Sequence, residues 1–438
     1  MASRHDAVVV GGGFAGLSAA VALAGKGKKV LVLDKKPRLG GRAYSFEENG
    51  LQVDNGQHLF MGCYWETLAF LDKIGTRDRL DIYPDVTVDY AEAGGKRARL
   101  SCPTWLPAPL HLAAGLLKLE GVTLKEKLAL MAFDEALKAL RKGEIPEAVE
   151  RQTVRQWLTG LGLSRNFQTR FFDPAAIGIL NESPDLASAA GFIQALRQMF
   201  LTGAASSRFA LARVGLSELY VDAAREYVEA RGGKVLSNAK AAEIVPGAVV
   251  TDMGSRFEAD AVVSALPPWD LKKLRLPDAL RGAWEELKPA PIVGATLRLD
   301  RAVMTERFVG LLGTETHWVF NKTLIHGTKE EGQTVAVVIS GAHKEAGWSP
   351  EKILSAATRD LSSCLPAFKD AKVLASKVVK EPFATLSPVP GDEQKRPLPG
   401  ATAAKGLFLA GDWTRTGLPA TIESACLSGR LAAEAAAV

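Results

Sequence analysis

The chain has 438 residues, of which 47% are hydrophobic and 24% are charged, and its formal net charge is +5 at pH 7. This length is enough for more than one domain, and the composition is that of an ordinary globular protein. The small net charge gives no support for nucleic-acid binding. No apolar run reaches transmembrane length, and we expect no signal peptide because the first predicted strand begins near residue 6.

The cysteines and histidines show no spacing that is typical of a metal site. We therefore expect no bound metal, and we expect reduced thiols in a cytoplasmic protein. These residues are Cys63, Cys102, Cys364, Cys426, His5, His58, His111, His317, His326 and His343.

A buried parallel strand is predicted at residues 7–10, where an alanine and three valines follow one another. The strand leads into a G-x-G-x-x-G motif and a predicted helix at 17–26, which is the setting of a dinucleotide-binding site. The three glycines permit a tight turn, close approach of the backbone to a pyrophosphate, and close helix packing. The helix N-terminus then attracts the phosphates. The expected cofactor contacts here are Gly11, Gly13, Phe14, Ala15 and Gly16.

A second strand is predicted at 29–33 and ends at Asp34. An acid at this place accepts hydrogen bonds from the ribose of the adenosine, and its charge disfavours the 2′-phosphate of NADP. We expect Lys35 and, from a later segment, Ala241 to contact the same end of the cofactor. A glycine loop follows, in which Gly40 and Gly41 allow close approach to a ligand and Arg42 offers a planar fork to phosphate oxygens.

The other half of the site is predicted near the end of the chain. An apolar strand at 406–410 leads into Gly411 and Asp412, and Asp412 is placed to bind the ribityl chain or a pyrophosphate-bound water. A final helix opens near 418–423 and runs to about 437, and the N–H groups of Ala420, Thr421 and Ile422 can face the pyrimidine edge of a flavin. The turn before Thr421 contains no cysteine, so the two halves together predict non-covalently bound FAD.

The pattern of elements predicts an α/β protein with an FAD-binding Rossmann-like domain of the glutathione-reductase type, a mixed-sheet substrate domain and a helical subdomain. The expected boundaries are 1–85, 215–270 and 381–438 for the discontinuous FAD-binding domain, 86–102 and 271–380 for the substrate-binding sheet domain, and 103–214 for the helical subdomain.

Leucines crowd the stretch 106–140 of the helical subdomain, with lysines between them. Two interpretations stay open. The leucines can pack the core of the subdomain, or they can form an amphipathic entrance on a membrane surface. On the second interpretation, peripheral contact of the cytoplasmic membrane surface runs through 104–142.

A set of segments spread along the chain matches one family: 53–58, 62–64, 66–68, 172–176, 180–181, 216–219, 411–425 and 428–430. With these segments the chain resembles the FAD-dependent hydroxysqualene dehydroxylases, in the squalene-associated branch of the amine oxidase and phytoene desaturase superfamily. The resemblance spans nearly the whole chain, with two departures: Asp34 stands where relatives often have glutamate, and Ser424 where glycine is common.

The resemblance implies reductive removal of the hydroxyl group of hydroxysqualene, a long apolar isoprenoid, with hydride from reduced FAD giving squalene for hopanoid or sterol synthesis. It implies that Gly56, Gln57 and His58 pass close to the flavin. The general acid is then His58, unless this histidine only hydrogen-bonds to cofactor or backbone. Asp173 is either a second candidate acid with a pKa raised by burial or a helix cap. Lys288 is a weaker candidate for holding a water near the flavin. The electron donor stays unknown.

Three other functions remain open at this stage. A carotenoid-type desaturase, acting on phytoene or C30 dehydrosqualene, would have the same fold and cofactor but move hydride into the flavin. A flavin amine oxidase would need an aromatic cage around the amine, to which Trp413 is a candidate contributor. A non-catalytic lipid-binding escort protein would keep the fold without redox chemistry.

Overall fold

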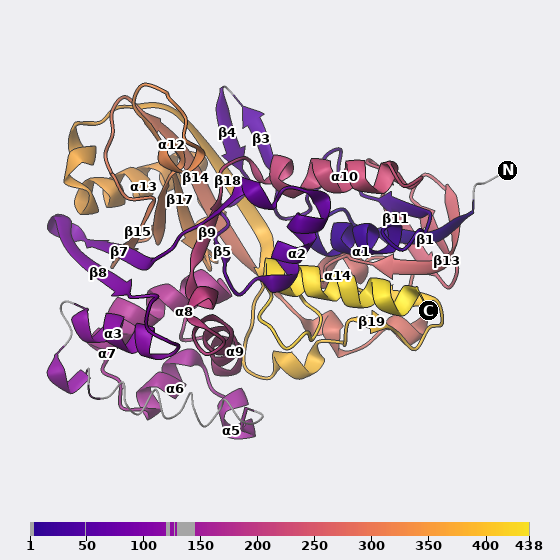
Figure 1. Ribbon diagram of the computed structural model, residues 1–438, viewed down its shortest axis with the longest axis horizontal. Helices are drawn as coiled ribbons and strands as arrows, with labels where there is room; N and C mark the ends of the chain where they lie inside the picture. The colour runs from indigo at the N-terminus through magenta and orange to yellow at the C-terminus, as the bar shows by residue number, and fades with distance from the viewer. Residues whose placement is uncertain (1–3, 49, 120–122, 127, 129–144, 438) are drawn as a thin grey trace.

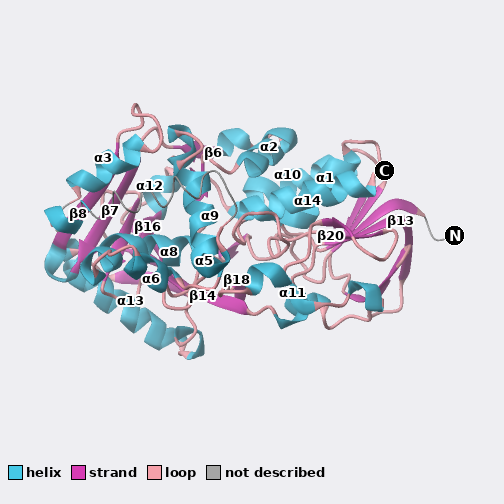
Figure 2. Cartoon of the chain, turned by 90° about the horizontal axis from the view of Figure 1, so that it is seen from below, coloured by secondary structure: helices cyan, strands magenta, loops and turns pink. Residues whose placement is uncertain are grey.

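The structure is a computed structural model that describes residues 4–48, 50–119, 123–126, 128 and 145–437. Two large sheets lie at opposite ends of an elongated molecule, and a group of helices lies beside the second sheet (Figure 1). The view turned by 90° shows helices and loops between the two ends (Figure 2).

The first sheet has the strand order β10-β2-β1-β13-β12-β11, and β20 also pairs with β13 while β19 pairs with β20. Strands β10, β2, β1, β13 and β20 run parallel to one another. Most residues of β1 and all of β2 are buried, as in a parallel sheet covered on both faces. The bounds are β1 His5–Val10, β2 Val30–Leu33, β10 Lys234–Leu236, β11 Ala241–Val245, β12 Ala248–Thr251, β13 Arg256–Ser264, β19 Gly400–Ala401 and β20 Leu407–Leu409.

Helices α1 (Phe14–Ala24), α10 (Asp222–Glu229) and α14 (Ile422–Ala436) pack together on this sheet. In Figure 1, α14 runs alongside α1, although the two come from opposite ends of the chain. Gly429 makes this contact close, because a Cβ there would lie 2.3 Å from the carbonyl oxygen of Ala15. The final helix therefore packs closely on α1.

The second sheet has the strand order β18-β14-β17-β16-β15-β7-β8. All neighbours are antiparallel except β15 and β7. Helix α13 (Pro350–Cys364) packs through apolar side chains on one face. The short helix α12 (Lys322–His326) joins β16 to β17. The strand bounds are β7 Val86–Glu92, β8 Lys96–Cys102, β14 Pro289–Leu299, β15 Phe308–Leu312, β16 Trp318–Asn321, β17 Gln333–Ser340 and β18 Val373–Leu386.

Two small sheets and a set of short helices complete the described chain. The small sheets pair β3 with β4, and β5 with β9 and β6. Helices α3 and α6 to α9 share one apolar cluster with β7 and β8. The bounds are β3 Ser45–Glu48, β4 Leu51–Asp54, β5 Phe60–Met61, β6 Leu80–Ile82, β9 Phe209–Ala212, α2 Trp65–Ile74, α3 Leu110–Lys118, α5 Glu147–Glu150, α6 Val154–Gly160, α7 Arg165–Phe167, α8 Asp173–Leu180, α9 Ala189–Phe200 and α11 Pro268–Leu271.

Three local features differ from the sequence prediction. The apolar pattern at 235–244 predicts one strand, but the structure divides it into β10 and β11, because Asn238 takes a left-handed conformation with a φ of 55°. Strand β9 lies within the segment 103–214 that was predicted to form the helical subdomain. The boundary expected at 380 falls inside β18, which pairs with β14 as far as Leu386. The division into three domains stays a prediction.

Replacing Gly429 by alanine should separate α14 from α1. The new Cβ would meet the backbone of Ala15, so we expect a loss of about 1–3 kcal/mol in the free energy of unfolding. The control is Gly160→Ala in α6, where an added Cβ meets no atom within 4 Å and stability should stay the same or rise slightly. Urea unfolding measures both, and equal stabilities of the two variants would contradict the close contact.

Candidate active site

The turn between β1 and α1 is shaped by its glycines. Gly11 has a φ of +110°, and a Cβ on Gly16 would lie 1.8 Å from the carbonyl oxygen of Gly11. Among the described residues no side chain caps α1 at Gly13. The N–H groups of Phe14, Ala15 and Gly16 therefore have no helical acceptor, which makes this helix end suitable for an anionic pyrophosphate.

The second glycine loop lies against the first. The amide of Gly40 donates a hydrogen bond to the carbonyl of Gly12 at 2.8 Å. A Cβ on Gly41 would lie 3.1 Å from the Cα of Gly13. Because neither loop carries a side chain at this contact, the two form one backbone surface of the kind that a pyrophosphate can approach.

Asp34 is buried at the end of β2. Its Oδ2 accepts a hydrogen bond from the amide of Gly12 at 2.7 Å, and its Oδ1 accepts one from the amide of Lys36 at 2.8 Å. Burial raises the pKa of this carboxyl, although both hydrogen bonds lower it. Each oxygen keeps a second lone pair, so ribose hydroxyl groups can still bind there.

Two other residues predicted near the adenosine have different surroundings. Lys35 pairs with Asp270 at 2.6 Å, and its side chain is 40% exposed. Ala241 is buried at the start of β11. Just before it, the amide of Ala239 donates to the carbonyl of Asp34 at 2.8 Å, so this segment crosses the end of β2, where the adenosine is predicted to lie.

An ion pair joins the two predicted halves of the site. Nη2 of Arg42 lies 2.5 Å from Oδ1 of Asp412, across 370 residues of sequence. Arg42 also donates to the carbonyl of Ala384 at 3.2 Å and lies over the ring of Trp269. Burial is the largest single effect and lowers the pKa of Arg42, but the nearby carboxylates, Asp412 first among them, together raise this pKa above its usual value.

Arg396 supports the Gly411–Trp413 turn, and the sequence analysis missed it. Its side chain is buried and donates to the carbonyls of Asp412 at 3.0 Å, Trp413 at 3.1 Å and Leu418 at 3.1 Å. Trp413 itself is buried, and its Nε1 donates to the carbonyl of Leu266 at 3.0 Å. A single arginine in a loop carries no motif, so nothing in the sequence marked its role.

The start of α14 is fixed by polar contacts. Thr421 is the N-cap residue, and Ala420, Thr421 and Ile422 are each half-buried. Glu423 is buried and accepts hydrogen bonds from the amides of Glu66 at 2.8 Å and Thr67 at 2.9 Å at the start of α2. The first turn of α14 therefore has one defined position beside the Asp412 loop.

The segment after β4 is attached to Arg42. Nδ2 of Asn55 donates to the carbonyl of Arg42 at 3.0 Å, and its Oδ1 accepts from the amide of Tyr44 at 2.9 Å. Gly56, Gln57 and His58 follow, so they begin directly beside the Arg42 loop. Their predicted place near the flavin is compatible with this position.

Lys322 comes to this segment from α12, and the sequence analysis missed it. Its Nζ lies 2.5 Å from Oδ2 of Asp54 and 3.2 Å from Oε1 of Gln57. The side chains of Lys322 and Asp54 are only 6% and 7% exposed. A buried pair of this kind is held firmly, because losing one partner would leave an uncompensated charge.

Two histidines flank the pair. Among the described residues neither Nε2 of His58 nor Nε2 of His326 has a hydrogen-bond partner, and both atoms are buried. Burial lowers the pKa of each imidazole to about 4, although Asp54 raises both. Imidazolium is then scarce at neutral pH, so His58 is poorly suited to be the proton donor predicted from the resemblance, while its predicted contact with the cofactor remains open.

A small inner cavity, with a volume of about 20 Å³, lies between this segment and the second sheet. Asp54, Gln57 and Lys322 form its polar end, and small or aliphatic side chains of β14, β17 and β18 form most of its walls. The other lining residues are Gly56, Ile292, Gly294, Ala295, Thr296, Ala336, Val337, Val338, Lys377 and Val379.

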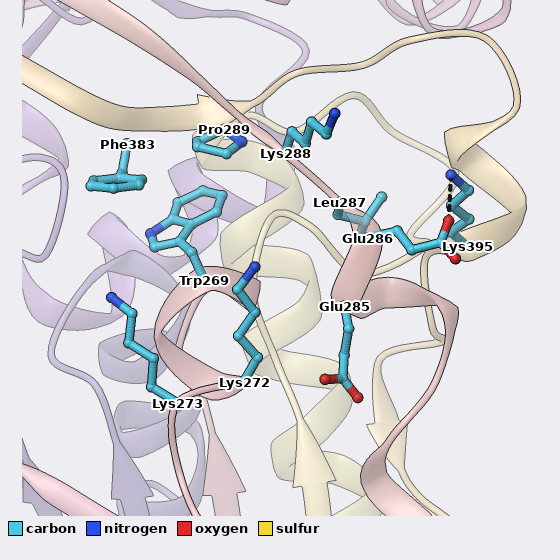
Figure 3. A pocket seen from close by; sticks show the side chains of 10 residues that line it. All are labelled: Trp269, Lys272, Lys273, Glu285, Glu286, Leu287, Lys288, Pro289, Phe383 and Lys395. Atoms are coloured by element: carbon cyan, nitrogen blue, oxygen red, sulfur yellow. Dashed lines mark ion pairs between the residues drawn. The ribbon is translucent and has the colours of Figure 1, made fainter.

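A second hollow, the outer cleft, has a volume of about 640 Å³ and opens on the surface beside Trp269. Figure 3 shows Trp269 and Phe383 side by side, with Lys395 paired to Glu286. Lys288 lies in this outer cleft and is exposed, rather than in the inner cavity. Its suggested part in holding a water near the flavin is therefore not supported.

Asp173 lies away from both hollows. Its Oδ2 pairs with Nη2 of Arg155 at 2.7 Å, and Arg155 also pairs with Asp185. Asp173 therefore accepts a hydrogen bond from Arg155 in place of facing a substrate. Asp173 is not a helix cap either, because the N-cap residue of α8 is Phe172. The π-helical turn at Gln168–Phe172 runs directly into α8. This geometry favours a structural role for Asp173.

Much of the leucine-rich stretch at 104–142 lies outside the described residues. In the part that is described, Leu112 and Leu116 of α3 are buried, whereas Trp105, Leu110 and Leu117 are exposed. Within the described ranges no helix is long and apolar enough to cross a membrane.

No group of three or more potential ligands for a metal ion occurs in the same ranges.

Breaking the ion pair at either residue should weaken FAD retention. A hydrogen bond to a charged group contributes about 1.5–3 kcal/mol, so we expect Arg42→Met and Asp412→Asn each to lower FAD affinity roughly 10- to 100-fold. Arg225→Met is the control, since it breaks an exposed pair with Glu229. Flavin fluorescence during dialysis measures release, and unchanged retention in both site variants would contradict the assignment.

The low pKa of His58 should also make stability depend on pH. Unfolded histidine binds a proton below about pH 6.5, whereas folded His58 binds one only near pH 4, so its contribution is complete above pH 6.5 and is lost as the pH falls toward 4. We expect the stability difference between wild type and His58→Asn to change by up to about 1.4 kcal/mol per pH unit in this window. Urea unfolding at several pH values tests it, and a constant difference would show that burial does not shift this pKa.

The described residues fit FAD: a glycine cradle with free helix N–H groups, a buried acid at the ribose position, and an Arg42–Asp412 junction with the second half of the site. Comparison with known proteins agrees. The chain matches the family of flavin containing amine oxidoreductases over residues 14–437. It is 27% identical to the hydroxysqualene dehydroxylase of Zymomonas mobilis over 437 residues, covering 98% of each chain.

Two further similarities extend the comparison. The chain is 27% identical to the 15-cis-phytoene desaturase of Synechococcus elongatus, covering 98% of this chain and 94% of that protein. The cyclohexylamine oxidase of Brevibacterium oxydans has the same fold, with a TM-score of 0.73, 18% identity and 99% of both chains covered. The predicted α/β fold, the FAD cofactor and the resemblance to hydroxysqualene dehydroxylases are thus confirmed. The chain belongs to the flavin containing amine oxidoreductase family and is an FAD-dependent oxidoreductase.

Proposed function

We propose that this enzyme converts hydroxysqualene to squalene by replacing the hydroxyl group with hydrogen. The similarity to a hydroxysqualene dehydroxylase along the whole chain supports this substrate. The observation that carries the proposal is the inner cavity, which combines aliphatic walls with one charged end. Its volume of about 20 Å³ is room for the hydroxyl end of a substrate and not for the whole hydrocarbon chain. An apolar alcohol needs both, since its hydrocarbon chain must leave water and its hydroxyl group must meet a polar partner.

The walls of the inner cavity are mostly apolar. Gly294 keeps the surface of β14 low, and Ala336 and Val338 of β17 add aliphatic contacts. Water excluded from such a surface cannot quench a carbocation formed by loss of the hydroxyl group. Reduced FAD, when bound, supplies the hydride that the substrate carbon receives.

The polar end of the inner cavity lies beside the cofactor loops. Asp54 ends β4, and the next residue, Asn55, is hydrogen-bonded to the carbonyl of Arg42. Gln57 is itself one of the predicted flavin contacts, and Lys322 is hydrogen-bonded to it. A substrate hydroxyl group that binds to Gln57 and Lys322 would therefore lie close to the flavin. The segment 54–58 then orients the reacting end of the substrate, while the second sheet holds its tail.

We also propose that the enzyme takes its substrate from a membrane surface through the region 104–142. Five large apolar side chains in the described part of this region are exposed, from 55% for Leu117 to 80% for Trp105. Exposed apolar groups gathered in one stretch of chain are typical of contact with lipid or with another protein. The other three are Leu110, Leu124 and Leu128.

A second candidate is desaturation of a carotenoid precursor, because a phytoene desaturase is similar over nearly the same length. That reaction moves hydride from the substrate to FAD and has no leaving hydroxyl group. An amine oxidase is less favoured, since Trp413 packs against Trp284 and is not among the described residues that line the inner cavity.

The two directions of hydride flow can be separated in one anaerobic experiment. The purified flavoprotein is reduced with dithionite, mixed with hydroxysqualene, and followed by flavin absorbance while lipids are extracted. We expect reoxidation of the flavin together with formation of squalene, and no reoxidation by squalene itself. A flavin that stays reduced with hydroxysqualene, and oxidised enzyme that is bleached by phytoene, would establish the desaturase instead.

A further inference from the structure

We infer that Lys322 donates the proton that lets the substrate hydroxyl group leave as water. This inference rests on the proposed dehydroxylation and adds to it the general acid. Loss of hydroxide from carbon is slow unless the oxygen is protonated as the bond breaks. A donor must therefore stand at the polar end of the inner cavity, and Lys322 is an ammonium group at that place.

The position of Lys322 suits this task. Two of its three N–H groups are accounted for by Oδ2 of Asp54 at 2.5 Å and Oε1 of Gln57 at 3.2 Å. Within the described part of the chain the third N–H has no hydrogen-bond partner, and Lys322 lines the inner cavity while being only 5% exposed. An ammonium in such surroundings presents its proton without competition from bulk water.

The helix that carries Lys322 is held rigidly. Asn321 caps α12 by accepting a hydrogen bond from the amide of Leu324 at 3.0 Å. The hydroxyl oxygen of Thr323 accepts one from the amide of Thr334 at 2.7 Å, and this bond ties α12 to β17. A donor fixed in this way needs little rearrangement before the proton moves.

The other acid-base groups around the inner cavity are less suitable. Burial lowers the pKa of His58 and of His326 to about 4, so both imidazoles are neutral at physiological pH. Asp54 is ion-paired and accepts rather than donates. Lys377 pairs with Glu48 at 2.6 Å, and its side chain is 33% exposed.

The pair of Lys322 and Asp54 also matches the charge of the reaction. Before proton transfer the two side chains together are neutral. After transfer, lysine is neutral and the carboxylate remains, so the pair carries one negative charge when the carbocation forms nearby. The balance is complete: the alcohol takes a proton from Lys322 and leaves as water, reduced flavin supplies a hydride to the cation, and the amine regains a proton from solvent.

Single-turnover kinetics of the dithionite-reduced holoenzyme tests the inference. We expect Lys322→Met to slow flavin reoxidation by hydroxysqualene at least about 100-fold. Lys322→Arg keeps the charge and the pairing with Asp54, but a guanidinium does not release its proton, so we expect a similar loss. The control is Lys395→Met, which removes a lysine paired with two acids, Glu286 at 2.9 Å and Asp392 at 3.2 Å, outside the inner cavity.

A second substrate distinguishes a proton donor from a structural residue. The trifluoroacetate ester of hydroxysqualene releases a carboxylate, which leaves without protonation. We expect Lys322→Met to react with this ester within roughly threefold of the wild-type rate, because no general acid is then required. FAD content and the temperature of unfolding are recorded for each variant.

The outcomes separate the two claims. If wild type and Lys322→Met reoxidise at the same rate with hydroxysqualene, the inference is wrong and the dehydroxylase function stands. If Lys322→Met loses its rate toward both substrates, the residue is structural and the inference is also overturned. If wild type itself is not reoxidised by hydroxysqualene, the proposed function fails, and with it the role of Lys322.

Discussion

The ion pair between Arg42 and Asp412 is the contact on which the rest of the site depends, because it fixes two loops that are 370 residues apart. Arg42 is bound on its other side by Asn55, which holds the segment carrying His58. Asp412 is supported through its backbone by Arg396. Loss of the pair would release both loops, and the inner cavity would lose one of its walls.

The close packing of α1 and α14 makes this ion pair possible. Gly429 brings α14 against α1 near Ala15, and the start of α14 is where the Asp412 loop ends. The same helix fixes α2 through Glu423. A single small residue in the final helix therefore affects the position of cofactor loops at both ends of the chain.

The parts that could be predicted from the sequence are those whose signal is local. Gly11, Gly13 and Gly16 stand in a motif with a strand before it and a helix after it, so their roles follow from neighbouring residues. Lys322 could not be found in this way, because α12 is short and its acidic partner lies 268 residues away. Arg396 was missed because a single arginine in a loop carries no motif, although its partners lie within 22 residues.

Two errors have equally specific causes. The single strand expected at 235–244 is interrupted because the chain turns at Asn238 to cross the end of β2, a tertiary contact that apolar periodicity does not reveal. Asp173 was considered as an acid because its neighbours are aromatic. Its partner Arg155 comes from another helix, α6, so the ion pair between the two was not visible in the sequence.

We propose that the reaction takes place in the inner cavity between the segment 54–58 and the second sheet, and not in the outer cleft beside Trp269. A crystal structure of the FAD-bound protein tests this most directly. We expect the flavin ring to contact Gln57 or His58 and to face the inner cavity at Lys322. A flavin ring lying in the outer cleft, against Trp269 and Lys288, would contradict it.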